Sequence, residues 1–96
     1  MRVITTRMDE KDVKDLIEIE KEERAERAEV IRRLLGKAIK EWKTQKALEK
    51  LREHKISLRK ASEFAGISYI EMLDLSSKAG IDTGYSLKEL ERDLKR

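Results

Sequence analysis

The side chains able to carry out acid–base or metal chemistry are few in this chain of 96 residues. There is no cysteine, which excludes disulfides, thiolate zinc sites and cysteine nucleophiles. His54 is the only histidine, so no site can hold several histidine ligands, and a Ser-His-Asp triad is not expected. His54 follows a run of helix-forming residues, where its protonated form would suit the negative end of a helix dipole. We therefore expect no catalytic residue, no metal site and no cofactor, and we do not expect an enzyme.

The charged side chains are more informative, because their signs are segregated along the sequence. Residues 9–29 contain five basic and ten acidic side chains, whereas residues 30–60 contain eleven basic and three acidic ones. Arg2 and Arg7 add a basic N-terminal tip. A basic middle and a basic tip could contact the phosphates of a nucleic acid. The alternative is a solvated helix surface held by ion pairs.

Composition also indicates where such a protein works. The chain has no asparagine or proline, Gln45 is its only glutamine, and Lys, Arg, Glu and Ile are abundant, a pattern typical of hyperthermophile proteins. No stretch is apolar enough for a membrane span, and the N-terminus does not look like a signal peptide. We expect a cytoplasmic protein of thermophilic type.

The N-terminal residues 3–8 are rich in β-branched types and predict one short strand. Its two faces are Ile4, Thr6 and Met8 on one side and Val3, Thr5 and Arg7 on the other. A lone strand cannot satisfy its backbone donors and acceptors, and no second strand-like run exists in the sequence. The simplest partner is the same strand of a second copy, which predicts a homodimer.

Two helices are expected after the strand. The first runs from about residue 10 to 22 with Asp9 as N-cap, and a weak break follows near residues 23–26. The second could continue to Arg52, with Gly36 as an interior weak point. It carries more apolar residues than a monomeric surface helix needs, which suggests burial on two sides. These residues are Val30, Ile31, Leu34, Leu35, Ala38, Ile39 and Trp42.

One strand followed by two helices over residues 2–42 resembles the ribbon-helix-helix family, on the segments ITTRM, DEKDVKDLIEI and EVIRRLLGKAIKEW. In that family two chains intertwine, and their paired strands enter the major groove of DNA. The resemblance implies that Val3, Thr5 and Arg7 face the bases and that Arg2 reaches a phosphate. Arg7 would read guanine with two hydrogen bonds.

The turn before the second helix departs from the family pattern. Members usually have a glycine in the turn and a Ser or Asp cap, after which the helix amides grip a phosphate. Here Glu26 and Glu29 place negative charge at that point, and Arg24 and Arg27 could offset it. We therefore include Arg24 and Arg27 among the expected DNA-binding residues.

Residues 58–75 fit the spacing of a helix-turn-helix, with Gly66 in the turn and with Ser57 and Ser68 as caps of the two helices. A recognition helix usually displays basic or amide side chains to DNA. This one displays Glu71 and Asp74 instead. We expect a structural or partner-binding unit and not a DNA reader.

The segments KISLRKASEFAGISYIEMLDLSSKAGI and YSLKELERDL are similar to a family of small prokaryotic antitoxins, often archaeal or cyanobacterial. The match covers about residues 46–94. The resemblance implies an antitoxin encoded beside a PIN-domain ribonuclease toxin, as in VapB-type pairs. Such antitoxins commonly repress their own operon, a role that a ribbon-helix-helix N-terminus would serve.

Residues 82–96 are expected to form a short helix, opened by a capping box over residues 86–89, that binds the toxin. Its expected partner-binding residues are Tyr85, Leu87, Leu90, Arg92 and Leu94. Arg92 is the best candidate to enter the carboxylate cluster of a PIN-domain nuclease. The alternative is that this helix packs on its own chain.

Together these patterns predict a mainly α protein in three parts. Residues 1–45 form a ribbon-helix-helix dimerisation and DNA-binding domain, residues 46–81 a helix-turn-helix-like unit, and residues 82–96 a partner-binding tail. The expected function is an antitoxin of a type II pair, with operator DNA, a PIN-domain toxin and a second copy as partners and with no membrane. The alternatives are a stand-alone ribbon-helix-helix regulator with a helical oligomerisation or effector domain, and a protein-interaction module that does not bind DNA.

Overall fold

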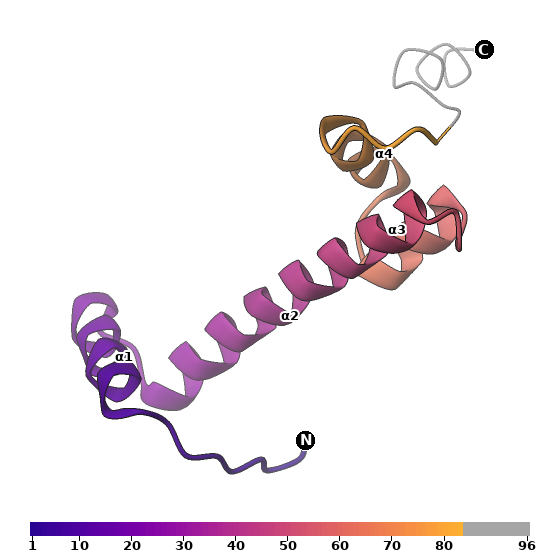
Figure 1. The fold of residues 1–96 in the computed structure, drawn as a ribbon. Helices are drawn as coiled ribbons and strands as arrows, with labels where there is room; N and C mark the ends of the chain where they lie inside the picture. Colours follow the sequence, from indigo (N-terminus) through magenta and orange to yellow (C-terminus); the bar gives the residue numbers. More distant parts are fainter. Residues whose placement is uncertain (84–96) are drawn as a thin grey trace. The chain divides into compact units, whose positions relative to one another are not determined.

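The computed structural model describes residues 1–83, most of which are helical (Figure 1). The helices of this part are α1 (Glu10–Glu23), α2 (Arg27–Arg52), α3 (Leu58–Ala65) and α4 (Tyr69–Lys78). The prediction of a mainly α protein is confirmed. By its internal contacts the chain divides into two compact units, Met1–Lys37 and Ala38–Arg96, the second described as far as residue 83. The functional division after residues 45 and 81 stays a prediction, and the expected C-terminal helix lies outside the described residues.

The strand expected over residues 3–8 is not formed, and on this point the prediction was wrong for the single chain. Residues 1–9 are neither strand nor helix, and Figure 1 shows them as an extended segment leading into α1. The reason lies in backbone hydrogen bonding. A strand exists only beside another strand, and residues 1–83 contain no second one.

Helix α1 begins and ends close to where the sequence indicates. Asp9 has the extended conformation of an N-cap, although its side chain makes no capping hydrogen bond. The acidic side chains of Glu10 and Asp12 lie in the first turn, where the helix dipole favours negative charge. The break near residues 23–26 is confirmed, and it occurs without glycine. Arg24 adopts the left-handed conformation (φ 52°), and the N–H of Ala25 then bonds back to the carbonyl oxygen of Glu20 at 3.2 Å.

Helix α2 is a single helix of 26 residues that continues through Gly36 (Figure 1). Near its C-terminal end, Ala47 and Leu51 are buried. Ile39 and Trp42 in the same unit are 48% and 61% exposed. With 3.6 residues per turn, these two pairs lie on different sides of the helix. The helix therefore has a second apolar side that the described part of its own unit leaves open.

The unit that begins at residue 38 has its own hydrophobic core, formed where the end of α2, helix α3 and helix α4 meet. The core residues are Ala47, Leu51, Leu58, Ala61, Ala65, Met72, Leu73 and Ile81. The predicted caps at the starts of both short helices are confirmed. Ser57 Oγ accepts from the N–H of Lys60, and Ser68 Oγ accepts from the N–H of Glu71, each at 3.1 Å.

Two glycines end these helices. Gly66 and Gly80 have φ values of 70° and 72°, which a residue with a Cβ adopts only with strain. The next residue then bonds back to the helix in each case. The N–H of Ile67 reaches the carbonyl oxygen of Ser62 at 3.1 Å, and that of Ile81 reaches Ser76 at 2.9 Å. This is the Schellman pattern, and it turns the chain sharply after α3 and α4.

Residues 1–83 contain neither a membrane-spanning helix nor a cluster of metal-ligating side chains. None of their helices is both long and apolar enough to cross a membrane. No group of three or more His, Cys, Asp or Glu side chains in this range is placed to hold a metal ion.

Candidate nucleic-acid interface

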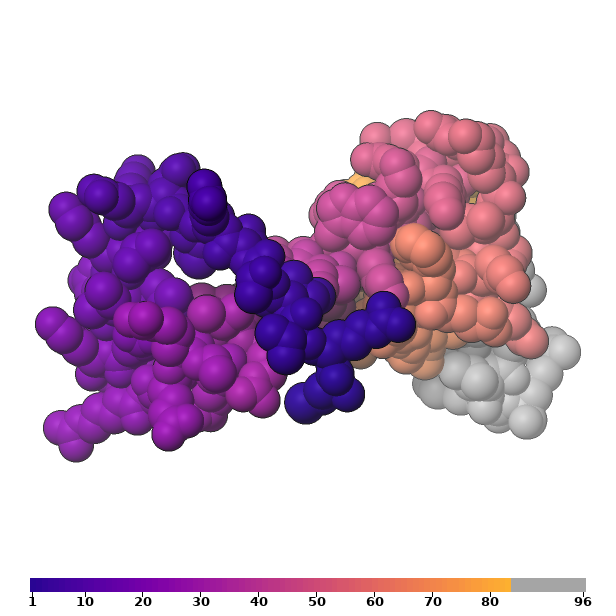
Figure 2. Space-filling model, turned by 90° about the horizontal axis from the view of Figure 1, so that it is seen from below, coloured from indigo at the N-terminus to yellow at the C-terminus, as the bar shows by residue number. Residues whose placement is uncertain are grey.

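The four N-terminal residues expected to contact DNA are all exposed. Arg2, Val3, Thr5 and Arg7 lie on the extended segment, which appears in indigo at the surface in Figure 2. Within residues 1–83, the guanidinium groups of Arg2 and Arg7 take part in no ion pair or hydrogen bond between side chains. These four residues are therefore accessible to a ligand in the single chain.

The expected alternation of the segment is found in its second half. Thr6 and Met8 line a strongly apolar hollow, whereas Thr5 and Arg7 do not line it. The other lining residues come from α1 and α2 and are Leu16, Ile31, Leu34 and Leu35. The first half of the segment does not follow the expectation. Ile4 is 85% exposed, and it lies with Val3 beside Ala28 and Ile31.

Helix α2 carries an open apolar stripe next to this hollow. Its members Ile31, Leu34, Leu35, Ile39 and Trp42 are between 37% and 61% exposed. In the unit Met1–Lys37, only Leu16 and Val30 are buried apolar residues. Most of the apolar side chains of this unit therefore remain in contact with water, which is unusual for a folded monomer and marks an interaction surface.

Two basic side chains near the start of α2 form ion pairs with glutamates of α1. Arg27 Nε donates to Glu20 Oε1 at 2.7 Å, and this carboxylate raises the pKa of Arg27 above its usual value. Arg33 forms an ion pair with Glu23. Arg24, the other expected phosphate contact, ends α1 in the left-handed conformation. A phosphate at this point would have to compete with Glu20 for the guanidinium of Arg27.

Helix α4, which stands where a recognition helix would stand, presents few basic groups. Glu71 is exposed in its first turn. Lys78, its only basic residue, is bound by Asp74, with Nζ 2.9 Å from Oδ2. These charges repel a phosphate backbone.

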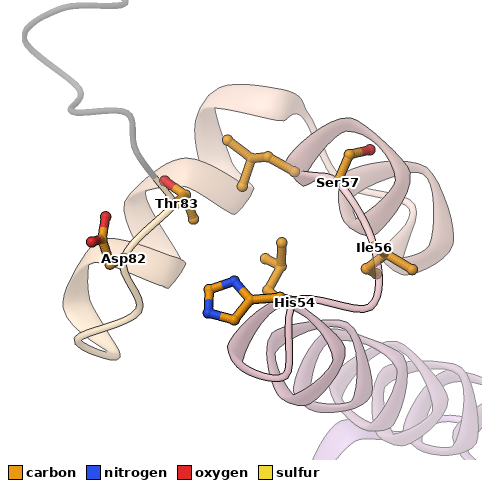
Figure 3. Close-up of a pocket in the computed structure, with 7 residues that line it drawn as sticks. His54, Ile56, Ser57, Asp82 and Thr83 are labelled. Atoms are coloured by element: carbon orange, nitrogen blue, oxygen red, sulfur yellow. The ribbon is translucent and has the colours of Figure 1, made fainter.

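A hollow lies where the chain leaves the described part, and Figure 3 shows its lining. The lining residues are Leu51, His54, Ile56, Ser57, Leu58, Asp82 and Thr83. His54 has a positive φ of 58°, and the N–H of Lys55 bonds back to the carbonyl oxygen of Lys50 at 2.9 Å. His54 thus ends α2, which gives the only histidine a structural role. The expected partner-binding residues Tyr85, Leu87, Leu90, Arg92 and Leu94 lie outside the described residues.

Sequence reasoning missed the ion pairs at the start of α2. Glu20 and Arg27 are seven residues apart, and Glu23 and Arg33 are ten apart. These separations cross the turn between two helices, so the spacing rules for pairs within one helix do not reveal them. The sequence hints at these ion pairs only through the alternating acidic and basic residues in α1 and at the start of α2.

Comparison with known proteins gives one match. The model of an uncharacterised protein family, UPF0175, matches residues 25–96, which include α2, α3 and α4. The N-terminal segment and α1 precede the matched region. No curated protein and no solved structure matches the chain.

Proposed function

The chain belongs to the UPF0175 family, and we propose that it is an antitoxin: a homodimer that represses its own operon by binding DNA and that neutralises a PIN-domain ribonuclease. The proposal combines three surfaces. These are the open apolar stripe of α2, the extended N-terminal segment and the C-terminal tail.

The open apolar surface of the unit Met1–Lys37 is the observation that carries the proposal. Full burial of one leucine or isoleucine side chain contributes about 1.5–3 kcal/mol relative to exposure. Ile31, Leu34 and Leu35 are each exposed by more than a third, and they lie together beside the hollow that Met8 lines. A second copy offers the same surface, and a two-fold arrangement would cover both at once.

The DNA-binding part follows from the N-terminal segment. In a dimer, residues 3–8 of the two chains would supply to each other the backbone partners that each lacks alone. Thr6 and Met8 would then lie over the helices, as they do in the single chain, and Thr5 and Arg7 would point outward. A two-stranded ribbon fits the major groove of B-DNA, where Arg7 could bind guanine O6 and N7.

The toxin-binding part rests on the similarity of residues 46–94 to prokaryotic antitoxins. The described part of the unit that begins at residue 38 supplies a folded base for this tail, with a core of α2, α3 and α4 residues. Leu87, Leu90 and Leu94 would pack in an apolar groove of the nuclease. Arg92 would enter the carboxylate cluster of the nuclease.

The test uses the full chain and the nuclease encoded by the neighbouring reading frame. The chain should block cleavage of a fluorescent RNA at a one-to-one ratio, and Arg92→Ala should weaken inhibition at least about tenfold, since a charged contact in an interface is worth more than 1.4 kcal/mol. Lys88→Ala is the matched control and should inhibit as the wild type does. If the chain binds its operator but leaves every neighbouring nuclease active, it is instead a stand-alone regulator.

A further inference from the structure

Gly36 lies in the interior of α2, and nothing in the described fold requires a glycine there. A glycine inside a helix lowers stability by about 0.5–1 kcal/mol relative to alanine. A Cβ added at Gly36 would meet no atom within 4 Å in the described part of the chain. Its φ is not positive, unlike those of Gly66 and Gly80. The chain therefore carries this cost without any gain in its own packing.

The residues around Gly36 on the helix surface are mostly basic. Arg33 and Arg32 lie three and four residues before it, and Lys40 and Lys43 lie four and seven residues after it. The exceptions at these spacings are Ile39, three residues after Gly36, and Glu29, seven residues before it. Residues at these spacings share one side of a helix. Since α2 is uninterrupted, this arrangement follows from helix geometry alone. We call these five residues, Arg32, Arg33, Gly36, Lys40 and Lys43, the α2 platform.

The platform is open and positively charged. All five residues are exposed. Arg33 is paired with Glu23, but no ion pair joins Lys40 or Lys43 to any residue of the described part. Of the apolar stripe, Leu34 and Trp42 lie far around the helix from the platform, and Ile39 borders it. A copy bound over Leu34 and Trp42 would therefore leave Lys40 and Lys43 accessible.

We propose that the α2 platform binds the sugar–phosphate backbone of duplex DNA, with Gly36 allowing that backbone to lie close to the helix. From Arg32 to Lys43 the helix advances about 16 Å. This equals the rise of roughly four to five nucleotides of one DNA strand. A side chain at position 36 would hold the strand away from the cations on either side. The inference rests on the proposed DNA binding and adds to it a contact that does not depend on sequence.

The chemistry of the platform favours a duplex over a single strand. Sites for single strands combine basic side chains with aromatic rings on which the bases stack. The only aromatic residue of α2 is Trp42, and it lies on the apolar stripe. Backbone contacts by lysine and arginine without stacking are typical of duplex binding that does not read bases.

The test measures fluorescence anisotropy with two DNA duplexes of equal length, one covering the region upstream of the protein's own reading frame and one with that sequence scrambled. The Lys40→Gln/Lys43→Gln variant should bind both duplexes about tenfold more weakly and should reduce the slope of log affinity against log salt by about two. Lys11→Gln/Lys14→Gln, on α1, is the control with the same loss of charge, and it should bind both duplexes with less than half of that effect.

The Gly36→Leu variant distinguishes an effect on DNA binding from an effect on folding, because it should raise stability and lower the affinity for DNA. Leucine favours the helix, so the unfolding midpoint should rise. The affinity for both duplexes should nevertheless fall about threefold or more. Wild-type affinity of both Gly36→Leu and the double lysine variant would overturn the proposal. The proposal would also be overturned if these variants lost affinity for the upstream duplex alone, or if the wild type bound a duplex RNA of the same sequence more tightly than the DNA.

The same experiment distinguishes failure of the platform from failure of the proposed function. The Arg7→Ala variant should lose the preference for the upstream duplex and keep most of its affinity for the scrambled one. If the wild type shows no such preference while the platform variants lose affinity for both duplexes, the operator repressor is wrong and the platform is right. If Arg7→Ala behaves as expected and the platform variants bind as the wild type does, the platform is wrong.

Discussion

The guanidinium of Arg52 donates a hydrogen bond from Nη2 to the main-chain carbonyl oxygen of Ala79, over a distance of 3.1 Å. The bond joins the last residue of α2 to the residue that ends α4, 27 positions later in the sequence. The amides of Gly80 and Ile81 satisfy the carbonyl oxygens of Ser77 and Ser76 at the same helix end. Arg52 thus fixes the point from which the chain continues toward its C-terminus.

Replacing Arg52 by methionine should therefore destabilise the protein. Arg52→Met keeps the apolar stem and removes the donor, which should lower the free energy of unfolding by about 1 kcal/mol. Urea denaturation at a fixed protein concentration measures this effect. Arg59→Met is the matched control, because the side chain of Arg59 makes no hydrogen bond or ion pair with the described residues. Equal stability of the two variants would show that the Arg52 bond contributes nothing.

The apolar stripe of α2 should be a subunit interface. Leu35→Asp would place a charge in the covered core of a dimer, once from each copy, and should weaken dimerisation about 100-fold or more. Sedimentation velocity over a dilution series measures the dissociation constant. Ile70→Asp, on α4, is the control with similar exposure (48% against 54% for Leu35), and it should leave the dimer intact. Equal effects of the two substitutions would contradict the assignment of the interface.

Introducing glycine at two helix ends that lack it should stabilise the protein. Arg24 and His54 have φ values of 52° and 58°, where any residue with a Cβ is strained. Arg24→Gly and His54→Gly should each raise the free energy of unfolding by about 0.5–1 kcal/mol, because glycine adopts this conformation without strain. Thermal unfolding is the measurement. Lys21→Gly, inside α1, should have the opposite effect, and a loss of stability in all three variants would argue against the strain.

The pairing of Glu20 with Arg27 should limit the affinity for DNA. Glu20→Gln would release the guanidinium for a phosphate, so the affinity for the upstream duplex should increase and the salt dependence should steepen by about one contact. Glu22→Gln, also on α1, removes the same charge from a side chain without an ion pair in the described part. If both variants gain affinity equally, the change comes from net charge and not from the release of Arg27.

The features that the sequence predicts correctly are those decided by neighbouring residues. Ser57 and Ser68 cap helices because a hydroxyl three residues before a free amide has a short-range partner. Gly66 ends α3 because it adopts the left-handed backbone conformation, which requires no distant partner. The apolar spacing of α2 predicts burial on two sides; Ala47 and Leu51 are buried, whereas Ile39 and Trp42 are exposed in the single chain, so burial of the second side stays a prediction.

The features that the sequence does not predict depend on distant partners. The pair of Arg27 and Glu20 forms only after a turn has brought two helices together. The strand that the sequence predicts over residues 3–8 is not formed in the single chain, because residues 1–83 offer no second strand to pair with it.

The proposed pairing of residues 3–8 between two copies can be tested directly. In a sample that mixes isotopically labelled and unlabelled copies, filtered nuclear Overhauser spectra report only contacts between chains. A two-stranded ribbon predicts contacts between residues 3–8 of the two copies in antiparallel order, with Thr5 and Thr6 of one chain near the same residues of the other. Intermolecular contacts confined to the helices, with residues 3–8 close to no residue of the other chain, would contradict the ribbon and the DNA-binding surface built on it.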